Sequence, residues 1–373
     1  LVQWAKSQFS AAELQLVLAG TSVCFDLSVF ELWAPLSSGG AVVLVENALA
    51  LPQVAEEVAV TLVNTVPSVM AELLRDGYRL PESVVTVNLA GEALSNALVA
   101  TVYEAGQVQQ VNDLYGPTEA TTYSTWERRE GSGRATIGRP ISNTEVYILD
   151  RWQQPVAVGV RGEIYLSGAG VGRGYWQRAE LTAERFVPHP YSERGGERLY
   201  RTGDEGRYLA DGRIEYLGRR DQQVKLRGYR IELGEIESAL ESYAGVRQAA
   251  VTVREQQLVG YVVGLEGSER EAAAELRPYL RERLPDYMVP QRWVVLEQMP
   301  LTSSGTIDRK RLPEPSGAGA GALEQEAGGE WSPVEELVAG IWSEVLRRGT
   351  VGKDENFFEL GGHSLLATQV LSR

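Results

Sequence analysis

The sequence predicts an α/β protein with a larger lobe built on a parallel sheet, within which one region is antiparallel and rich in strands. A smaller α+β unit follows, and the chain ends in the start of an all-α helical bundle. Up to about residue 114, short apolar runs alternate with helical patterns, which is typical of a parallel sheet covered by helices. From residue 134 to 217, short alternating strands are broken by glycine. With 373 residues, the chain has room for two to three domains of about 150 residues each.

The elements of the larger lobe follow from apolar patterning. The expected strands are Ala41–Val45, Val60–Val66 and Val84–Ala90, and the expected helices are Ser68–Arg75 and Ser95–Glu104. Ser10 and Glu13 form a capping box, which predicts that a helix begins there. Ligands bind beyond the carboxyl ends of parallel strands, so the loops after Val66, Ala90 and Leu114 are the expected location of a site.

The later elements are a strand over Gly162–Gly168 and then a mixed unit. In that unit we expect a helix over Gly234–Ser242, strands over Ala249–Val253 and Leu258–Leu265, and a helix from the capping box Ser268–Glu271 to about Leu284. The predicted domains are therefore residues 1–217 (larger lobe) and 218–312 (smaller unit).

Residues 313–331 are rich in Pro, Gly, Ala and Glu and are expected to form a flexible linker. After it, Ser332-Pro-Val-Glu335 combines an N-cap serine, a proline at the first helical position and a capping-box glutamate. The helix that follows should have one apolar face, made of Val334, Leu337, Val338, Ile341, Trp342 and Val345. Residues 332–373 form the fourth predicted segment, the incomplete helical bundle.

Composition excludes several classes of function. Lys and Arg number 36 against 50 for Asp and Glu, and the net charge of −14 argues against nucleic acid or an anionic membrane as a partner. The single cysteine, Cys24, rules out a disulfide framework and is expected to pack as a small apolar side chain in a reducing cytoplasm. Two distant histidines cannot assemble a zinc site with it. No apolar run is long enough to span a membrane.

The segment Tyr115-Gly-Pro-Thr-Glu119 is the first candidate for chemistry. Gly-Pro forces a tight turn after a predicted strand and displays three functional side chains at the edge of the sheet. The aromatic ring can stack on a base, the hydroxyl can meet a phosphate oxygen, and the carboxylate can hold Mg²⁺ beside phosphates. Taken alone, the segment could equally be a polar surface turn.

A second group comprises Tyr200-Arg-Thr-Gly-Asp204, Tyr216–Asp221 and Gln223–Glu237. A carboxylate after a glycine turn suits the two hydroxyls of a ribose, although Asp204 could instead accept backbone N–H groups within its own turn.

Together these segments resemble the ordered core motifs of nonribosomal peptide synthetase adenylation domains. The resemblance also includes Phe25–Ser28, Gly162–Trp176, Leu284–Pro290 and Leu301–Lys310, and Phe357–Leu365 resembles the attachment motif of a peptidyl carrier protein. It covers essentially the whole chain and implies an adenylate-forming ligase fold. The implied enzyme activates an amino acid as its aminoacyl adenylate with ATP and passes it to a phosphopantetheine thiol.

The resemblance also implies residue roles. Tyr115 would stack on adenine, Thr118 would face phosphate, Glu119 would hold Mg²⁺ and Asp204 would bind the ribose hydroxyls. The remaining roles are nucleotide support by Tyr216 and Arg219, a hinge at Asp221, and a border of the pantetheine tunnel at Gly228.

Substrate choice would depend on Asp26, the implied partner of the substrate α-ammonium group. The other implied pocket positions are Leu27, Phe30, Asn64, Asn88, Ala90, Leu114, Thr122 and Tyr123. Because none of these eight is charged, we expect a small neutral amino acid, with alanine favoured and glycine next.

Ser364 follows Gly-Gly-His in the carrier motif. His363 is adjacent on the predicted helix and is a poor base for it, whereas a hydroxyl at a helix start suits a phosphodiester. We expect 4′-phosphopantetheine on Ser364, attached by a phosphopantetheinyl transferase, with condensation or other synthetase domains as neighbours.

The sequence departs from the family pattern in two places. Nothing matches the phosphate loop that should precede Phe25, so we expect the start of the adenylation domain to be missing from this chain. Thr306 stands where the family has its catalytic lysine, and a neutral hydroxyl cannot replace that charge. Adenylation is therefore expected to be impaired.

Two alternatives remain open. A degenerate adenylation unit would present a carrier that another enzyme loads in trans, which Thr306 favours. The other alternative is an acyl- or aryl-CoA ligase of the same superfamily. Asp26 and the carrier sequence in the same chain oppose it, because such a ligase needs neither.

Overall fold

The computed structural model describes residues 1–221, 223–226, 228–255, 257–265, 267–302, 307–315, 331–346, 349, 351–353, 357, 360, 362, 366–367 and 370. Its contacts divide the chain into two compact units, one of residues 1–221 with 227–229 and one of residues 222–226 with 230–373. No helix in the part of the chain that the structure describes has the length and apolar character needed to cross a bilayer.

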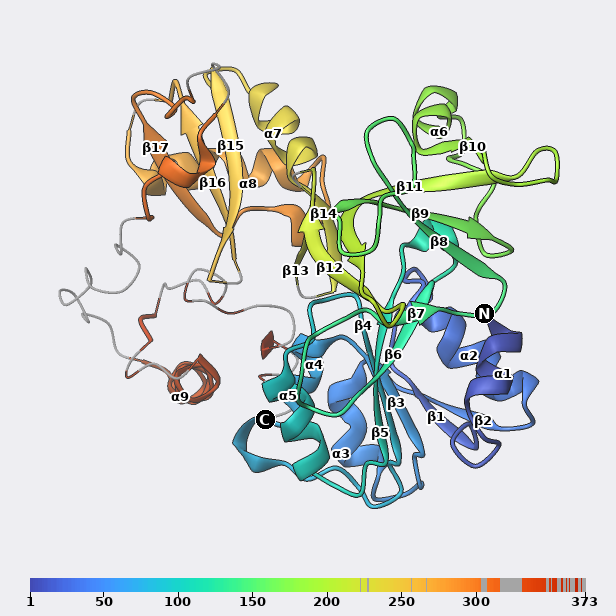
Figure 1. Ribbon diagram of the computed structural model, residues 1–373. Coiled ribbons are helices and arrows are strands. Elements are labelled where there is room, and N and C mark those ends of the chain that lie inside the picture. The colour runs from blue at the N-terminus through green and yellow to red at the C-terminus, as the bar shows by residue number, and fades with distance from the viewer. Residues whose placement is uncertain are drawn as a thin grey trace. The chain divides into compact units, whose positions relative to one another are not determined.

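A seven-stranded sheet organises the first unit, in the order β2-β1-β3-β4-β5-β6-β7 (Figure 1). Its strands are β1 (Leu16–Ala19), β2 (Ala41–Leu44), β3 (Leu62–Thr65), β4 (Thr86–Ala90), β5 (Gln110–Tyr115), β6 (Thr125–Arg129) and β7 (Arg139–Pro140). Strands β1 to β5 pair in parallel, and β6 and β7 are antiparallel to their neighbours. The predicted parallel sheet is confirmed.

Helices cover both faces of this sheet (Figure 1). The helices are α1 (Val2–Gln8), α2 (Leu27–Ser37), α3 (Leu51–Val54), α4 (Pro67–Leu73) and α5 (Asn96–Glu104), with short 3₁₀ turns at Ala48–Ala50 and Arg75–Gly77. One core contains side chains of α1 and α2, and the other contains side chains of α3, α4 and α5. Strands β3 and β4 are buried along their whole length, as expected when both faces are covered. Each fully buried Val or Leu contributes about 1.5–3 kcal/mol, so these apolar runs determine where the strands form.

The helix predicted at Ser10 is wrong. The capping-box hydrogen bonds do form, because the Ser10 N–H donates to Glu13 and the Glu13 N–H donates to the Ser10 hydroxyl. The chain makes only a turn there, and β1 begins at Leu16 between β2 and β3. Sheet pairing of the apolar run therefore overrides the local helix signal.

Cys24 is exposed, so the expectation that it packs as a small apolar side chain is also wrong.

The antiparallel region predicted after residue 134 is confirmed. It is a five-stranded sheet in the order β10-β11-β9-β8, with β12 paired to β11. Its elements are β8 (Thr144–Leu149), β9 (Gly162–Gly168), α6 (Ala179–Arg185), β10 (Phe186–Pro188), β11 (Arg198–Tyr208) and β12 (Ile214–Arg219). Its core of Ile, Leu and aromatic residues includes Tyr115, the last residue of β5. The strand end that carries the first motif therefore packs into this core.

Up to residue 312, the described part of the second unit contains a three-stranded sheet and two helices. Its elements are α7 (Leu233–Glu241), β15 (Gln248–Arg254), β16 (Gln257–Val263), α8 (Glu269–Arg281), a 3₁₀ turn (Asp286–Met288), β17 (Arg292–Leu296) and a second 3₁₀ turn (Arg309–Arg311). Strand β13 (Gln223–Leu226) pairs with β14 (Tyr229–Glu232). The capping box at Ser268 is formed, and α8 buries Ala272, Leu276 and Leu280 at a spacing of four residues.

Helix α9 (Pro333–Leu346) begins at the predicted cap, where the Glu335 N–H donates to the Ser332 hydroxyl. Only part of its predicted apolar face is covered within the described residues. Val345 is buried with Phe357 and Leu366, whereas Val334, Leu337 and Val338 are exposed. The covering side chains contact the second half of the helix, so the prediction of one continuous packed face holds only there.

Candidate functional site

The turn between β5 and β6 forms the centre of the site. Gly116 is required there, because a Cβ atom on it would lie 2.5 Å from the backbone oxygen of Thr122. After a 3₁₀ turn at Thr118–Ala120, Thr121 and Thr122 adopt left-handed φ values of 61° and 68°. That conformation is unusual for β-branched residues and costs of order 1–3 kcal/mol each, so the surrounding contacts must hold the turn in place.

Three of the expected nucleotide residues, Tyr115, Tyr216 and Arg219, come together around Asp204, a buried residue of β11. Its carboxylate accepts hydrogen bonds from the Tyr115 hydroxyl at 2.5 Å, the Tyr216 hydroxyl at 3.2 Å and the Arg219 guanidinium at 2.7 Å. The rings of Tyr115 and Tyr216 lie 6.1 Å apart, between their centres. Burial, followed by the negative charge of Asp204, raises the pKa of both tyrosines above their usual range. Both hydroxyls therefore remain protonated donors.

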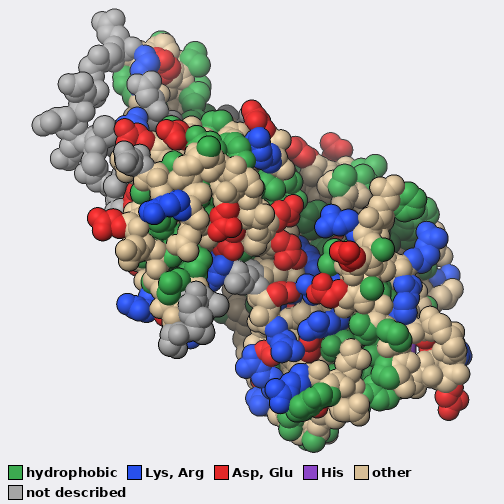
Figure 2. Space-filling model, turned by 90° about the horizontal axis from the view of Figure 1, so that it is seen from above, with side chains coloured by type: hydrophobic (Ala, Val, Ile, Leu, Met, Phe, Trp, Pro, Cys, Tyr) green, Lys and Arg blue, Asp and Glu red, His purple; other side chains and the backbone are tan. Residues whose placement is uncertain are grey.

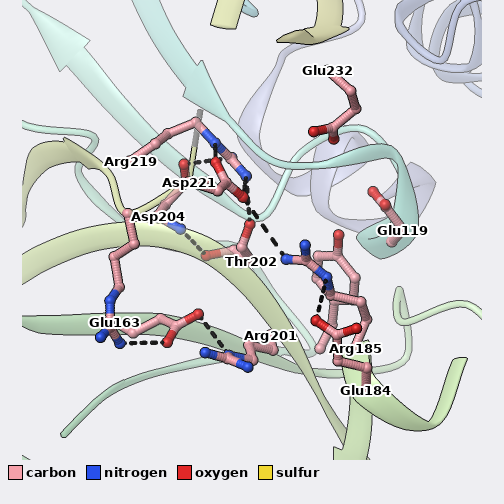
Figure 3. Close-up of polar contacts among 12 residues, drawn as sticks. Glu119, Glu163, Glu184, Arg185, Arg201, Thr202, Asp204, Arg219, Asp221 and Glu232 are labelled. Carbon is pink, nitrogen blue, oxygen red and sulfur yellow. Dashed lines mark hydrogen bonds and ion pairs between the residues drawn. The ribbon is translucent and has the colours of Figure 1, made fainter. Parts of the chain in front are cut away.

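Arg219 joins Asp204 to Asp221, as Figure 3 shows. Its guanidinium binds the Asp221 carboxylate through two hydrogen bonds of 2.7 and 2.8 Å and also donates to the backbone oxygen of Thr202. Arg185 lies 3.9 Å from the same Asp221 carboxylate. The residue expected to act as the hinge is thus held by two cations directly after β12.

Glu119 lies in the 3₁₀ turn and is partly exposed. The Tyr175 hydroxyl donates to its Oε1 at 2.6 Å. A carboxylate at the edge of the sheet, near the expected phosphate position, has the chemistry to hold Mg²⁺. Among the described residues, no group of three or more His, Cys, Asp or Glu side chains is arranged as a metal cage. A Mg²⁺ ion held by Glu119 would take its remaining oxygen ligands from nucleotide phosphates and water.

Asp26 is the N-cap residue of α2 and is half-buried. The Thr118 hydroxyl donates to its carboxylate at 2.7 Å, and the Thr122 hydroxyl donates to its backbone oxygen at 2.8 Å. The turn that carries Tyr115 therefore also positions the carboxylate expected to bind the substrate amine.

The other expected pocket residues lie on the face of the sheet that α1 and α2 cover. Asn64 pairs in register with Asn88, and Ala90 pairs with Leu114. All eight are buried, and five of them belong to one core cluster: Leu27, Phe30, Ala90, Leu114 and Tyr123. The structure thus brings the predicted pocket positions together.

Sequence reasoning missed Glu31 and Tyr175. Glu31 is fully buried and binds Thr21 and Asn64. It follows Leu27 by one helical turn, so a charge on the apolar face of α2 was the available signal. Tyr175 lies in a glycine-rich segment without periodicity, and nothing in the sequence indicated that it contacts Glu119.

The remaining predicted site residues are Gly228, Thr306 and Ser364. Gly228 has a φ of +80°, its N–H donates to Glu92 at 2.6 Å, and a Cβ atom on it would lie 3.0 Å from Val66. These contacts leave little room for a side chain at that turn. Thr306 and Ser364 lie outside the described residues.

Comparisons with known proteins agree with this geometry. A model of AMP-binding enzymes matches residues 2–176, and a model of their C-terminal domain matches residues 235–306. A model of the phosphopantetheine attachment site matches residues 336–373. The solved structure of holo-PA1221, described as an NRPS protein containing adenylation and PCP domains, has 30% sequence identity and a TM-score of 0.73. The match covers 98% of this chain and 61% of that one.

The chain therefore has the adenylate-forming fold and carries adenylating ligase sequence of the nonribosomal peptide synthetase family, followed by a phosphopantetheine carrier region. It is 50% identical over 379 residues to one of the linear gramicidin synthase proteins of Brevibacillus parabrevis. It is 42% identical over 379 residues to the dimodular nonribosomal peptide synthase of Bacillus subtilis (strain 168). These matches cover 99% and 98% of this chain but span only 7% and 15% of the respective relatives.

Proposed function

We propose that this chain activates a small neutral amino acid, with alanine favoured and glycine next, as its aminoacyl adenylate at the expense of ATP. The aminoacyl group would then pass to the carrier region of the same chain. The observation that carries the proposal is the β5–β6 turn, because one short segment contacts both Asp204, through Tyr115, and Asp26, through Thr118. A nucleotide and an amino acid bound to these carboxylates would have their reacting groups held near one another, which is the main requirement of this chemistry.

The nucleotide roles follow from the contacts around Asp204. Its carboxylate would accept the ribose hydroxyls, Tyr115 would contact the base, and Tyr216 and Arg219 would hold the carboxylate in place. Glu119 would hold Mg²⁺, which supplies neutralisation of phosphate charge when bound, and Thr118 would face phosphate.

The amino-acid roles follow from Asp26 and the buried pocket. Asp26 would pair with the α-ammonium group of the substrate. The apolar side chains of Phe30 and Leu114 and the ring of Tyr123 would limit the size of its side chain. Asn64, Asn88, Ala90, Leu27 and Thr122 would complete the wall, without a charged group to recruit a charged side chain.

We further propose that residues 1–217 and 218–312 act as the two subdomains, joined at Asp221 as hinge, with 313–331 as linker and 332–373 as carrier. Gly228 would border the path of the pantetheine arm. A phosphopantetheine on Ser364 would supply the thiol that receives the aminoacyl group, after modification by a phosphopantetheinyl transferase. The expected setting is the cytoplasm, beside condensation or other synthetase domains.

The test is ATP–pyrophosphate exchange by the complete module that contains this chain. Alanine should give the highest kcat/KM, glycine the next, and aspartate, lysine and phenylalanine at least about 100-fold less. Propionate, which lacks the amine, should be a poor substrate for the parent, and Asp26→Asn should reduce exchange with alanine much more than with propionate. A preference for a charged or aromatic amino acid would contradict the proposal.

A second candidate is a carrier loaded in trans, which Thr306 at the position of the family lysine favours. Intact mass spectrometry separates the two. After phosphopantetheinyl transfer, addition of ATP and alanine should add an alanyl group to the carrier, and Ser364→Ala should abolish both mass increases. If the carrier gains phosphopantetheine but never an amino acid, loading in trans is supported instead. Activation of acids without transfer to the carrier would support the CoA-ligase alternative.

A further inference from the structure

Glu31 is a fully buried carboxyl group on α2, directly beside the expected amino-acid pocket. The side chains that hydrogen-bond to it are neutral: Thr21, which precedes α2, and Asn64 on β3. Burial raises its pKa, and the hydrogen bonds from these partners partly oppose that shift. Burying an ionisable group costs free energy. The presence of one beside the pocket therefore calls for an explanation, which we seek in the neighbouring groups that it orients.

Three donors from Thr21 and Asn64 converge on this carboxyl group, and the backbone N–H of Gly20 also lowers its pKa. The Thr21 N–H lies 3.0 Å from Oε2, the Thr21 hydroxyl lies 2.5 Å from Oε1, and Asn64 Nδ2 lies 3.0 Å from Oε1. A carboxylate can accept all three, because it has two oxygens and no proton of its own.

The contact with Glu31 determines the orientation of the Asn64 amide. Because Nδ2 faces Glu31, Oδ1 faces the other way and accepts the hydroxyl proton of Tyr123 at 2.6 Å. Asn64 and Tyr123 are both at most 2% exposed, and the Tyr123 ring packs 5.6 Å from Phe30, between ring centres. The Tyr123 proton is therefore bonded within the protein.

We propose that Glu31 is a positioning residue that sets the polarity of the amino-acid pocket. Through Asn64 it keeps the Tyr123 hydroxyl proton turned away from the substrate, so the pocket favours a side chain without a hydrogen-bond acceptor. An apolar side chain is therefore preferred over one that carries only an acceptor, such as an ether oxygen. The inference rests on the proposed function and names a residue outside the predicted pocket positions.

Glu31→Gln keeps the shape of the side chain but leaves one acceptor oxygen where there were two. Its new NH₂ group would face the existing donors, so Asn64 would turn its amide and present Nδ2 to the Tyr123 oxygen. The Tyr123 proton would then be free to donate to a substrate oxygen. A site that gains a donor gains preference for a substrate side chain that carries only an acceptor.

The experiment measures pyrophosphate exchange with norvaline and O-methylserine in the complete module, two isosteric amino acids that differ only in an ether oxygen that can accept but not donate a hydrogen bond. We expect Glu31→Gln to lower the norvaline/O-methylserine ratio of kcat/KM about tenfold, mainly through KM. In a Tyr123→Phe background the same substitution should change the ratio less than about twofold, because no hydroxyl proton remains to be released. Glu72→Gln, at another buried glutamate, on α4, is the matched control and should leave the ratio unchanged.

Equal losses for both substrates, or a ratio change that persists in Tyr123→Phe, would overturn the proposal and leave Glu31 with a structural role only. If Glu31→Gln does not fold, Asn64→Leu removes the same acceptor from Tyr123 and should shift the ratio in the same direction. Failure of the proposed function would show differently, as an absence of exchange with every amino acid.

An NMR readout keeps the inference testable without catalysis. In protein labelled with ¹⁵N-asparagine, the side-chain amide resonances of Asn64 should move in Glu31→Gln and stay in place in Glu72→Gln. Unchanged Asn64 resonances in Glu31→Gln would also overturn the proposal.

Discussion

At the scale of single residues, Asp204 gathers several polar contacts in the candidate site. Two tyrosine hydroxyls and one guanidinium donate to its carboxylate, and its own N–H donates to the Thr202 hydroxyl at 2.9 Å. These contacts fix the carboxylate before any ligand binds, so little ordering cost remains to be met on binding.

We therefore expect Asp204→Asn to raise the KM for ATP about 10- to 100-fold, because an amide offers fewer acceptor sites than the carboxylate and no charge. With 2′,3′-dideoxy-ATP, which lacks the ribose hydroxyls, parent and variant should differ much less. Asp211→Asn, in the exposed turn between β11 and β12, is the matched control. An equal penalty with both nucleotides would show that Asp204 does not bind the ribose.

Sequence reasoning found residues at strand ends more readily than residues that act through others. Tyr115 and Asp204 stand beside turns whose position the Gly and Pro pattern reveals, whereas Asp26 was found only through the family resemblance. Glu31 and Tyr175 function through tertiary contacts with residues 33 and 56 positions away, and local pattern carries no information about such distances.

At the scale of elements, the same Ser-x-x-Glu signature had different outcomes at three places. It begins helices at Ser268 and Ser332 but only a turn at Ser10. An amphipathic helical pattern follows Ser268, whereas an apolar run that pairs in the sheet follows Ser10. The cap satisfies its N–H groups in each case, and tertiary packing decides whether a helix continues.

The cap of α9 leads to a prediction about pH. The Glu335 carboxylate accepts the Ser332 N–H and lies 3.0 Å from Lys353 Nζ, and these contacts lower its pKa to about 2. Since this folded-state pKa lies below the unfolded value of about 4.5, the stabilising contribution is complete above about pH 4.5 and is lost as the pH falls toward 2.

A carbon-detected NMR titration of the side-chain carboxyl should give a midpoint near 2 for Glu335. Lys353→Met should raise that midpoint partly, and Ser332→Ala should raise it as well, because each removes one of the lowering contacts. A midpoint near the unfolded value in the parent would show that the cap is not formed in solution.

At the scale of the whole molecule, the order of the structural regions along the chain was more predictable than the packing of their side chains. The parallel sheet, the antiparallel region and the α+β unit follow from the spacing of apolar residues and from the positions of Gly and Pro. The spacing is informative because local backbone geometry sets the periodicity of a helix or strand. The exposure of the first half of the apolar face of α9 could not be predicted, because burial depends on which side chains distant in the sequence pack against it.

Figure 2 shows acidic, basic and apolar side chains interspersed over the visible face, so the net charge of −14 is not gathered there into one acidic tract.

Thr306 concerns the activity of the entire module. We expect Thr306→Lys to raise the rate of pyrophosphate exchange about 100- to 1000-fold, because a positive charge that stabilises a transition state commonly contributes on the order of 3–4 kcal/mol. Thr101→Lys, which adds the same charge at an exposed position of α5, should have no effect. If the parent module and its Thr306→Lys variant exchange at the same rate, the lysine is not needed in this protein.

The two left-handed threonines have a consequence for anyone who would redesign the specificity of this protein. A segment held in a strained shape by contacts at both of its ends transmits a disturbance from one end to the other. Substitutions within residues 115–123 should therefore disturb nucleotide and amino-acid recognition together. The regular strand positions Asn88 and Ala90 offer a place where one kind of recognition can be altered while the other is preserved.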